Sequence, residues 1–244
     1  MSRILSVVKW PAIVAAVVLA AVFALRAWQV QQGPPLRPWH TFAPQELDAA
    51  AIDRSDWAGY VAAEASAFDE VQREVTQKLE PEDRVPANRY FEGAPMYPGR
   101  FAQDWNRSFV LEPAGPPTGA VVLLHGLTDS PYSSRHVAKL YRDAGFVAVA
   151  IRLPGHGTVP AGLARVRWED WSAATRLAVR EAVRRAGPGK PLHLVGYSNG
   201  GALAMKYALE ALNDKALARP DRIVLPCTTC CTSSATRRAS RASA

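Results

Sequence analysis

Residues 192–201 combine a short apolar run, a sharp turn and the start of an alanine-rich helical pattern. The run predicts a strand over 192–195, and the pattern predicts a helix over 200–212. The turn between them reads Gly196-Tyr197-Ser198-Asn199-Gly200. Bulky residues two positions to either side of a serine at such an apex would clash, and glycine removes those clashes. The stretch therefore predicts a strand–turn–helix unit that lifts the Ser198 hydroxyl clear of a sheet, at the positive end of a helix.

From residue 105 onward, predicted strands and helices alternate. The run over 120–124 has no polar position, which is typical of a strand that is buried on both faces. Alternation of this kind predicts an α/β fold with a parallel sheet and helices on both of its faces. We expect strands over 108–111, 120–124, 146–151, 192–195 and from 222, and helices over 130–144, 167–186 and 200–212.

Residues 1–30 predict a transmembrane helix of the signal-anchor type. The sixteen residues from Trp10 to Leu25 carry no charge, and Trp10 and Trp28 flank the run as interfacial aromatics do. Residues 10–25 are thus expected to contact the membrane. Basic residues before the run favour a single-pass protein of the bacterial inner membrane with its catalytic domain outside the cytoplasm. A cleavable signal peptide and a buried soluble helix are the alternatives.

Residues 31–104 predict a proline-rich linker followed by an amphipathic helical segment. Apolar residues recur at helical spacing through 45–79, and Ser55 or Asp56 can cap this run. We expect the helix to pack on the main domain. Residues 81–103 hold several prolines and predict an irregular connection whose aromatic side chains serve packing.

Composition excludes several classes of function. The 244 residues are 48% hydrophobic, which is sufficient for one sizeable core. The net charge of +7 is scattered along the chain, so we expect no nucleic-acid partner. All three cysteines lie within 226–244, so the fold is expected to hold no disulfide framework, metal site or cofactor. The sequence leaves the oligomeric state open.

Two further motifs follow predicted strands. His125-Gly126-Leu127 comes directly after the strand over 120–124. A turn there brings backbone N–H groups over the carboxyl edge of the sheet, where acyl transfer needs donors for an oxyanion. The predicted donors are the amides of Leu127 and Asn199, and His125 is expected to be a structural hydrogen-bonder rather than a base.

The second motif, Pro154-Gly155-His156-Gly157, follows the strand over 146–151. Its glycines shape a loop at the same sheet edge, and we expect His156 to staple this loop rather than to act as a base.

Together, the three motifs resemble the α/β-hydrolase superfamily over roughly residues 105–225. Within it they resemble the serine-hydrolase branch that includes monoacylglycerol lipases, lysophospholipases, small carboxylesterases and serine aminopeptidase-like proteins. Trp168 to Trp171 is similar to the start of that branch's second helix. The resemblance implies that Ser198 attacks the carbonyl of a small-molecule ester or lipid, while a histidine takes its proton and an acid orients that histidine.

The sequence departs from the family in one respect. The family order is serine, acid, histidine, yet all five histidines precede Ser198. The acids after Ser198 are Glu210, Asp214 and Asp221, and none lies where the family has its triad acid. We therefore expect the triad acid and base to be missing from this chain. The alternatives to a serine hydrolase of carboxylic esters are an aminopeptidase-like amidase and an inert hydrolase remnant or membrane-tethered binding module.

The segment 226–244 is rich in Thr, Ser, Arg and Cys and shows no periodicity. We interpret it as an aberrant tail produced by a reading-frame shift near Pro226, with a natural disordered tail as the alternative. On this interpretation the α/β-hydrolase fold is incomplete. Poor solubility and weak or absent activity are expected, since an open sheet edge and uncovered apolar faces would remain.

Overall fold

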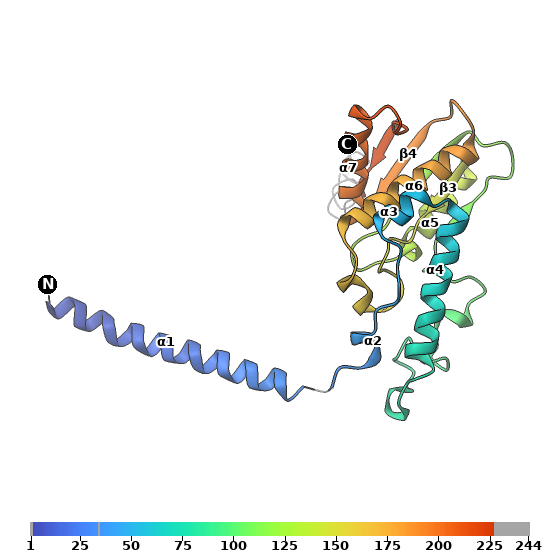
Figure 1. Ribbon diagram of the computed structural model, residues 1–244. Coiled ribbons are helices and arrows are strands. Elements are labelled where there is room, and N and C mark those ends of the chain that lie inside the picture. The colour runs from blue at the N-terminus through green and yellow to red at the C-terminus, as the bar shows by residue number, and fades with distance from the viewer. Residues whose placement is uncertain (1, 34, 227–244) are drawn as a thin grey trace, which may run out of the picture. The chain divides into compact units, whose positions relative to one another are not determined.

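The computed structural model of the chain describes residues 2–33 and 35–226 (Figure 1). The chain divides into two compact units, Met1–Arg37 and Pro38–Ala244. The segment predicted to be an aberrant tail lies outside the described residues from Cys227 onward.

The first unit is built on one helix, α1 (Ser2–Gln31). Its portion Lys9–Gln31 has a mean hydropathy of 2.1 and is long and apolar enough to cross a membrane by length and composition. At 1.5 Å per residue these 23 residues extend for about 35 Å, so the helix runs beyond the predicted apolar run on both sides. A signal sequence meets the same criteria.

The second unit contains a five-stranded sheet in the order β1-β3-β2-β4-β5. Four strands are parallel, as the strand–helix alternation predicts. The strands are β1 (Phe109–Leu111), β2 (Gly119–Leu124), β3 (Phe146–Ala150), β4 (Leu192–Gly196) and β5 (Arg222–Val224).

The first strand corrects the expectation of a wholly parallel sheet. β1 pairs with β3 in the antiparallel sense, with Phe109 opposite Ala150 and Leu111 opposite Ala148. Parallel neighbours need a crossover of a dozen or more residues. Residues 112–118 between β1 and β2 are too few for such a crossover, so the chain reverses and β1 becomes an antiparallel edge.

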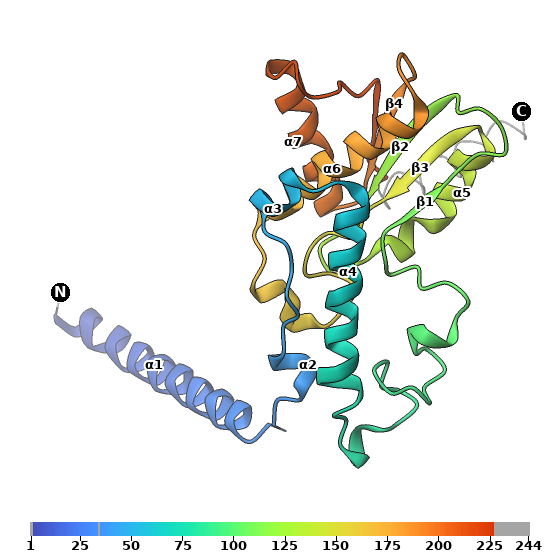
Figure 2. The same ribbon diagram turned by 45° about the vertical axis from the view of Figure 1, so that its right-hand side comes forward.

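Helices cover both faces of the sheet. The helix α5 (Arg135–Asp143) lies on one face, and α6 (Trp168–Ala186) and α7 (Asn199–Asn213) lie on the other (Figure 2). The predicted helix over 130–144 is shorter than expected, because its first turn is a 3-10 turn, η4 (Pro131–Ser134). Ser130 does not cap this turn; its hydroxyl donates to Asn106 Oδ1 at 2.9 Å instead.

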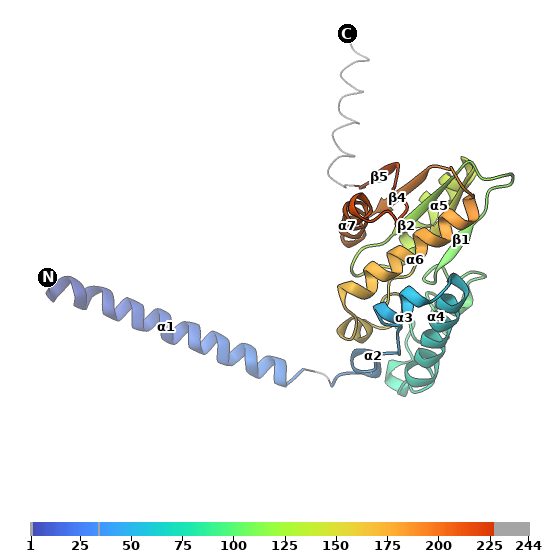
Figure 3. The same ribbon diagram turned by 45° about the horizontal axis from the view of Figure 1, so that its top comes forward.

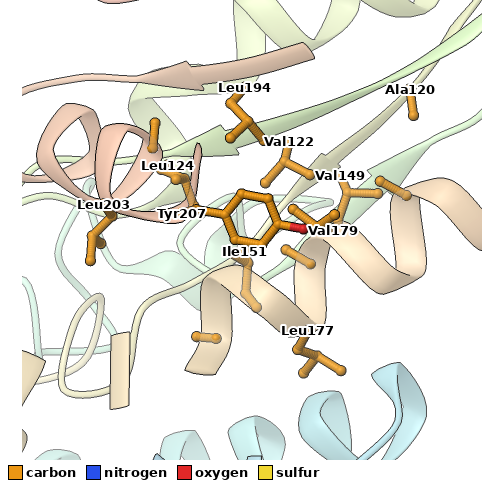
Figure 4. Packing of buried hydrophobic residues seen from close by; sticks show 14 of the residues in the cluster. Ala120, Val122, Leu124, Val149, Ile151, Leu177, Val179, Leu194, Leu203 and Tyr207 are labelled. Carbon is orange, nitrogen blue, oxygen red and sulfur yellow. The ribbon is translucent and has the colours of Figure 1, made fainter. Parts of the chain in front are cut away.

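The two sides of each central strand contribute to separate cores. Val122, Leu124 and Leu194 point to the side of α6 and α7, where they pack around Tyr207 (Figure 4). Val121 and Leu123 point to the side of α5. Every residue of β2 is buried. A strand that is covered on both faces must be apolar at every position, which explains the unbroken apolar run over 120–124.

Residues 38–104 pack against this sheet unit as short helices rather than as one long one (Figure 3). The predicted helix over 45–79 breaks at Ser55 and Asp56, and Asp56 Oδ1 caps the second part by accepting from the Gly59 amide at 2.8 Å. The elements are α2 (Pro38–Thr41), α3 (Ala49–Arg54), α4 (Trp57–Val71), a π turn η1 (Gln72–Thr76), and the 3-10 turns η2 (Pro81–Asp83) and η3 (Pro98–Arg100), with η5 (Pro160–Ala164) later in the chain.

Candidate active site

The carboxyl ends of β2 and β4 lie side by side in the sheet, with Leu124 opposite Gly196. The chain leaves β2 through α5 on one face and reaches β4 through α6 on the other. The connections therefore part at this point of the sheet, and α/β proteins bind their ligands at such switch points. The amide of Tyr197 donates to the Leu124 carbonyl at 3.1 Å and ties the two turns together. The stretches 125–127 and 196–200 therefore lie next to each other at this edge of the sheet.

Ser198 has a strained backbone conformation at this edge of the sheet. Its φ is 52° and its ψ is −116°, and it is the sole non-glycine residue with positive φ among the residues that the structure describes. An L-residue in such a conformation stores about 1–3 kcal/mol of strain. The side chain is exposed at the first turn of α7. The fold thus holds this serine in an unfavourable conformation and presents it to solvent.

The two flanking glycines make that conformation sterically possible. A Cβ on Gly196 would lie 2.3 Å from the carbonyl oxygen of Gly200. A Cβ on Gly200 would lie 2.1 Å from the carbonyl oxygen of Leu124 on the neighbouring strand. Both contacts are with backbone atoms, which cannot rotate away as a side chain can. The turn therefore requires glycine at both positions.

The turn after β2 adjoins the serine. A Cβ on Gly126 would lie 3.6 Å from the Ser198 Cβ and 3.3 Å from the Tyr197 ring. Within residues 35–226, neither the amide of Leu127 nor that of Asn199 donates to an acceptor. The Asn199 amide is moreover one of the unpaired N–H groups at the start of a helix. Both groups are free to bind an incoming oxygen.

His125 is buried, and both of its ring nitrogens are engaged. Its Nε2 accepts from the Leu153 amide at 3.0 Å, so Nδ1 carries the proton and lies 2.9 Å from the Gly126 carbonyl. Burial, together with the neighbouring His156, lowers the pKa of His125 to about 3. The ring is therefore neutral near pH 7 and links the turn after β2 to the loop after β3.

His156 lies in the core of the loop after β3. Its Nδ1 lies 3.0 Å from the Pro154 carbonyl, and burial lowers the pKa of the ring. The Nε2 atom is buried without a hydrogen-bond partner among the described residues. Trp171 from α6 donates to the same Pro154 carbonyl at 3.0 Å, which holds the loop against the helix.

The remaining histidines lie elsewhere. His193 lies in β4 against Phe146 and Tyr141, His136 lies in α5, and His40 lies in α2. Within the described part of the chain, the Ser198 hydroxyl forms no hydrogen bond. The structure thus brings Ser198, Leu127 and Asn199 together but does not bring a histidine ring to the serine.

A buried ion cluster behind the loop is not evident from the sequence. Arg152 lies two residues after the end of β3 and is only 1% exposed. Its guanidinium makes a two-point contact to Glu46, with both N–O distances at 2.8 Å, and donates from Nε to Glu64 at 3.1 Å. Burial alone would lower the pKa of Arg152, but the Glu46 carboxylate outweighs burial, and the pKa is raised.

This cluster fixes the loop over 152–157. Arg152 also donates to the His156 carbonyl at 2.9 Å, and Glu46 accepts from the Gly155 amide at 3.0 Å. Glu64 accepts from the amide and hydroxyl of Ser108 at the start of β1. The sequence signal of this ion cluster is an arginine that follows a buried strand. Nothing local to residues 46 or 64 marks them as its partners.

Metal binding has no cluster of side chains to support it in the described residues. Within residues 2–33 and 35–226, no three His, Cys, Asp or Glu side chains lie close enough together to hold a metal ion.

Comparison with known proteins places the fold in a family. The sequence model of the family described as the alpha/beta hydrolase fold matches residues 119–240, which is half of the chain. This protein belongs to the α/β-hydrolase fold family. The match begins at the first residue of β2 and includes the turns that carry Leu127, His156 and Ser198. It also enters the segment 226–244, whose interpretation as an aberrant tail stays a prediction.

The α/β hydrolase is similar to two curated proteins over a limited length. It is 34% identical over 88 residues to a thermostable monoacylglycerol lipase from Bacillus sp. (strain H-257), which covers 36% of this chain and 34% of that protein. It is 36% identical over 98 residues to esterase PIR7B from Oryza sativa subsp. japonica, covering 40% of this chain and 35% of that protein. The chain thus spans about a third of the length of the curated relatives that it matches.

A solved structure reported with LipS and LipT, two metagenome-derived lipolytic enzymes, is 30% identical with a TM-score of 0.43. The similarity covers 50% of this chain and 45% of that chain.

Proposed function

We propose that this α/β hydrolase cleaves carboxylic esters, with Ser198 as the nucleophile. The observation that carries the proposal is the backbone of Ser198, held at positive φ between two glycines that backbone atoms forbid from bearing a side chain. A strained serine at the end of a strand and the start of a helix is the arrangement of a nucleophile elbow. Family membership and the similarity to a lipase and an esterase support ester chemistry.

The oxyanion in this proposal is bound by the amides of Leu127 and Asn199. Both amides are without acceptors in the described residues, and they belong to the two turns that the Tyr197–Leu124 hydrogen bond holds together. The Asn199 amide also lies at the positive end of α7, where negative charge is stabilised. Gly196, Gly200, His125 and Gly126 shape these two turns, and Gly155 and His156 shape the loop after β3.

We further propose that residues 1–226 do not supply the general base. His125 has no free ring nitrogen, and the Nε2 atom of His156 is shielded from solvent. Without a base, the Ser198 hydroxyl is a weak nucleophile. This supports weak turnover and favours an inert or binding-only protein as the second candidate.

Membrane attachment through α1 completes the proposal. The span Lys9–Gln31 has the length and apolarity of a bilayer-crossing helix, and the exposed Trp10 and Trp28 lie near its two ends. A single-pass anchor of the bacterial inner membrane, with the hydrolase unit outside the cytoplasm, is the topology that we propose.

Chemical rescue separates these possibilities. The full chain in detergent is incubated with p-nitrophenyl butyrate at pH 7.5, with and without imidazole as an external base. We expect slow turnover that rises with imidazole, after the rate of the Ser198→Ala variant is subtracted as background. A fluorophosphonate probe should modify Ser198 slowly, and faster when imidazole is present, whereas Ser66→Ala, which removes an α4 serine, should leave that modification unchanged.

Each outcome has a defined meaning. Equal rates for the wild type and Ser198→Ala at every imidazole concentration, together with no modification of Ser198, would contradict the nucleophile. Turnover that depends on Ser198 but does not rise with imidazole would contradict the missing base. Cleavage of an aminoacyl p-nitroanilide in preference to the ester would favour the amidase.

A further inference from the structure

Two adjoining cavities form a cleft, and residues 89–106, most of which belong to the predicted irregular connection, supply most of the lining of the larger one. The two cavities have volumes of about 610 and 470 Å³. Both cavities are lined by Arg89, Asn106 and Tyr132, so they adjoin one another, and Ser198 is not among the lining residues of either. Each has the size of a small-molecule site, for which 300–1,000 Å³ is usual.

The walls of the larger cavity are mainly apolar. Its lining includes five apolar or aromatic side chains from the segment before β1, and two of them are more than half exposed, Met96 at 57% and Phe101 at 59%. Exposed apolar side chains that gather around one cavity indicate a place for an apolar ligand, whereas scattered ones do not. The five residues are Met96, Pro98, Phe101, Ala102 and Trp105.

The same cavity carries uncompensated positive charge. Arg89 and Arg135 line it, and neither has a carboxylate partner among the described residues. Asp104 is the acid in its lining, and it is already occupied by Arg107 at 3.5 Å and by the amide and side chain of Asn106.

One of the two arginines is held against Tyr132, a residue that both cavities share. The Arg135 guanidinium is held 3.6 Å above the Tyr132 ring, and its Nη1 donates to the Tyr132 carbonyl. Arg89 and Tyr132 both belong to the junction of the two cavities. Beyond that junction the second cavity is lined by Thr128 and Asp129, which follow Leu127 in the turn after β2. A charged head group at the junction would thus have its apolar chain along the residues around Phe101.

We propose that this cleft binds a single-chain anionic amphiphile of the fatty-acid carboxylate class. Arg89 and Arg135 hold the carboxylate through charge-assisted hydrogen bonds, and the walls around Phe101 bury the hydrocarbon chain. This binding site does not depend on any reaction at Ser198.

Photolabelling of the full chain in neutral phosphatidylcholine nanodiscs tests the proposal. The probe is dodecanoic acid with a diazirine near the end of its chain, and the matched probe is the corresponding dodecanol. Mass spectrometry after digestion should find carboxylate-probe adducts within residues 96–105. The alcohol probe should give about tenfold less, because it lacks the charge-assisted hydrogen bonds.

Variants assign the head-group contacts. Replacing both Arg89→Gln and Arg135→Gln should lower the adduct yield about tenfold, whereas Arg89→Lys with Arg135→Lys should retain most of it. The control Arg54→Gln, at the exposed end of α3, should change nothing. All variants should keep the helical circular dichroism of the wild type, since these side chains lie near the surface.

Equal labelling by the carboxylate and alcohol probes, adducts confined to other residues, or an undiminished yield in the glutamine variant would each overturn the proposal. Fluorophosphonate modification of Ser198, measured on the same preparation, separates this result from the proposed hydrolysis. A chain that modifies Ser198 but binds no carboxylate keeps its nucleophile and loses this site.

Discussion

Arg152 and Glu46 form a two-point ion pair, with Nη1–Oε1 and Nη2–Oε2 both at 2.8 Å, although 106 positions separate them in the chain. The arginine side chain is 1% exposed and the glutamate side chain 10%. Since Glu46 also accepts from the Gly155 amide, one carboxylate from the segment before the sheet holds the loop that contains His156. The segment 38–71 is therefore part of the structural support of the loop over 152–157 and not only a connection to α1.

Loss of the Glu46 charge should destabilise the sheet unit. We expect Glu46→Gln to lower the free energy of unfolding by about 3 kcal/mol, at the low end for a broken buried ion pair because Glu64 still faces Arg152. Urea denaturation followed by tryptophan fluorescence measures this change. The control Glu80→Gln removes an exposed carboxylate and should stay within about 0.5 kcal/mol of the wild type.

A side chain at Gly200 should disrupt the turn. In Gly200→Ala the new Cβ would meet the Leu124 carbonyl oxygen at 2.1 Å, so β2 and α7 must shift apart. We expect a loss of about 3 kcal/mol in unfolding free energy and no fluorophosphonate modification of Ser198. Gly115→Ala is the matched control, because a Cβ there meets nothing within 4 Å. If both variants unfold at the same denaturant concentration, the steric explanation is wrong.

Relief of the strain at Ser198 should stabilise the protein. Glycine adopts positive φ without the steric cost that Ser198 bears, so Ser198→Gly removes the strain. Glycine also loses more chain entropy on folding, so the expected net rise in the free energy of unfolding is about 1 kcal/mol. Ser198→Ala keeps the strain and should remain within about 0.5 kcal/mol of the wild type. Chemical denaturation of the three proteins provides the comparison, and equal stabilities for the two variants would rule out stored strain.

The buried His125 should make stability depend on pH. Burial lowers its pKa to about 3 from 6.5, so between these values the unfolded chain binds a proton that the folded chain does not. The stabilising effect is complete above pH 6.5 and is lost as the pH falls toward 3, by up to about 1.4 kcal/mol per unit. His156, whose pKa is also lowered, acts in the same direction.

Substitution isolates the contribution of His125. The loss of unfolding free energy between pH 7 and pH 5 should be about 2 kcal/mol smaller in His125→Gln than in the wild type. His136→Gln, at an exposed position of α5, should keep the full loss. A wild-type pH profile in His125→Gln would show that this ring does not carry the effect.

The strands and helices around Ser198 were predictable because their signals are local. The apolar run over 120–124 corresponds to β2, and the predicted helix over 167–186 corresponds to α6 (Trp168–Ala186). The break at Ser55 and Asp56 was harder, because apolar spacing continues across it. The antiparallel pairing of β1 was missed, since a three-residue strand carries no information on its neighbour.

The sequence by itself determined the turn at Ser198 and the α/β class of the fold. Two glycines four residues apart, a preceding apolar run and a following helical pattern act on one another through local sterics, and these do not depend on the rest of the chain. Only the tertiary structure decided that Glu46 and Glu64 meet Arg152, that both nitrogens of His125 are engaged, and that residues 89–106 enclose a cleft. Such contacts depend on how segments far apart in the chain pack in three dimensions, and no local pattern of residues encodes that packing.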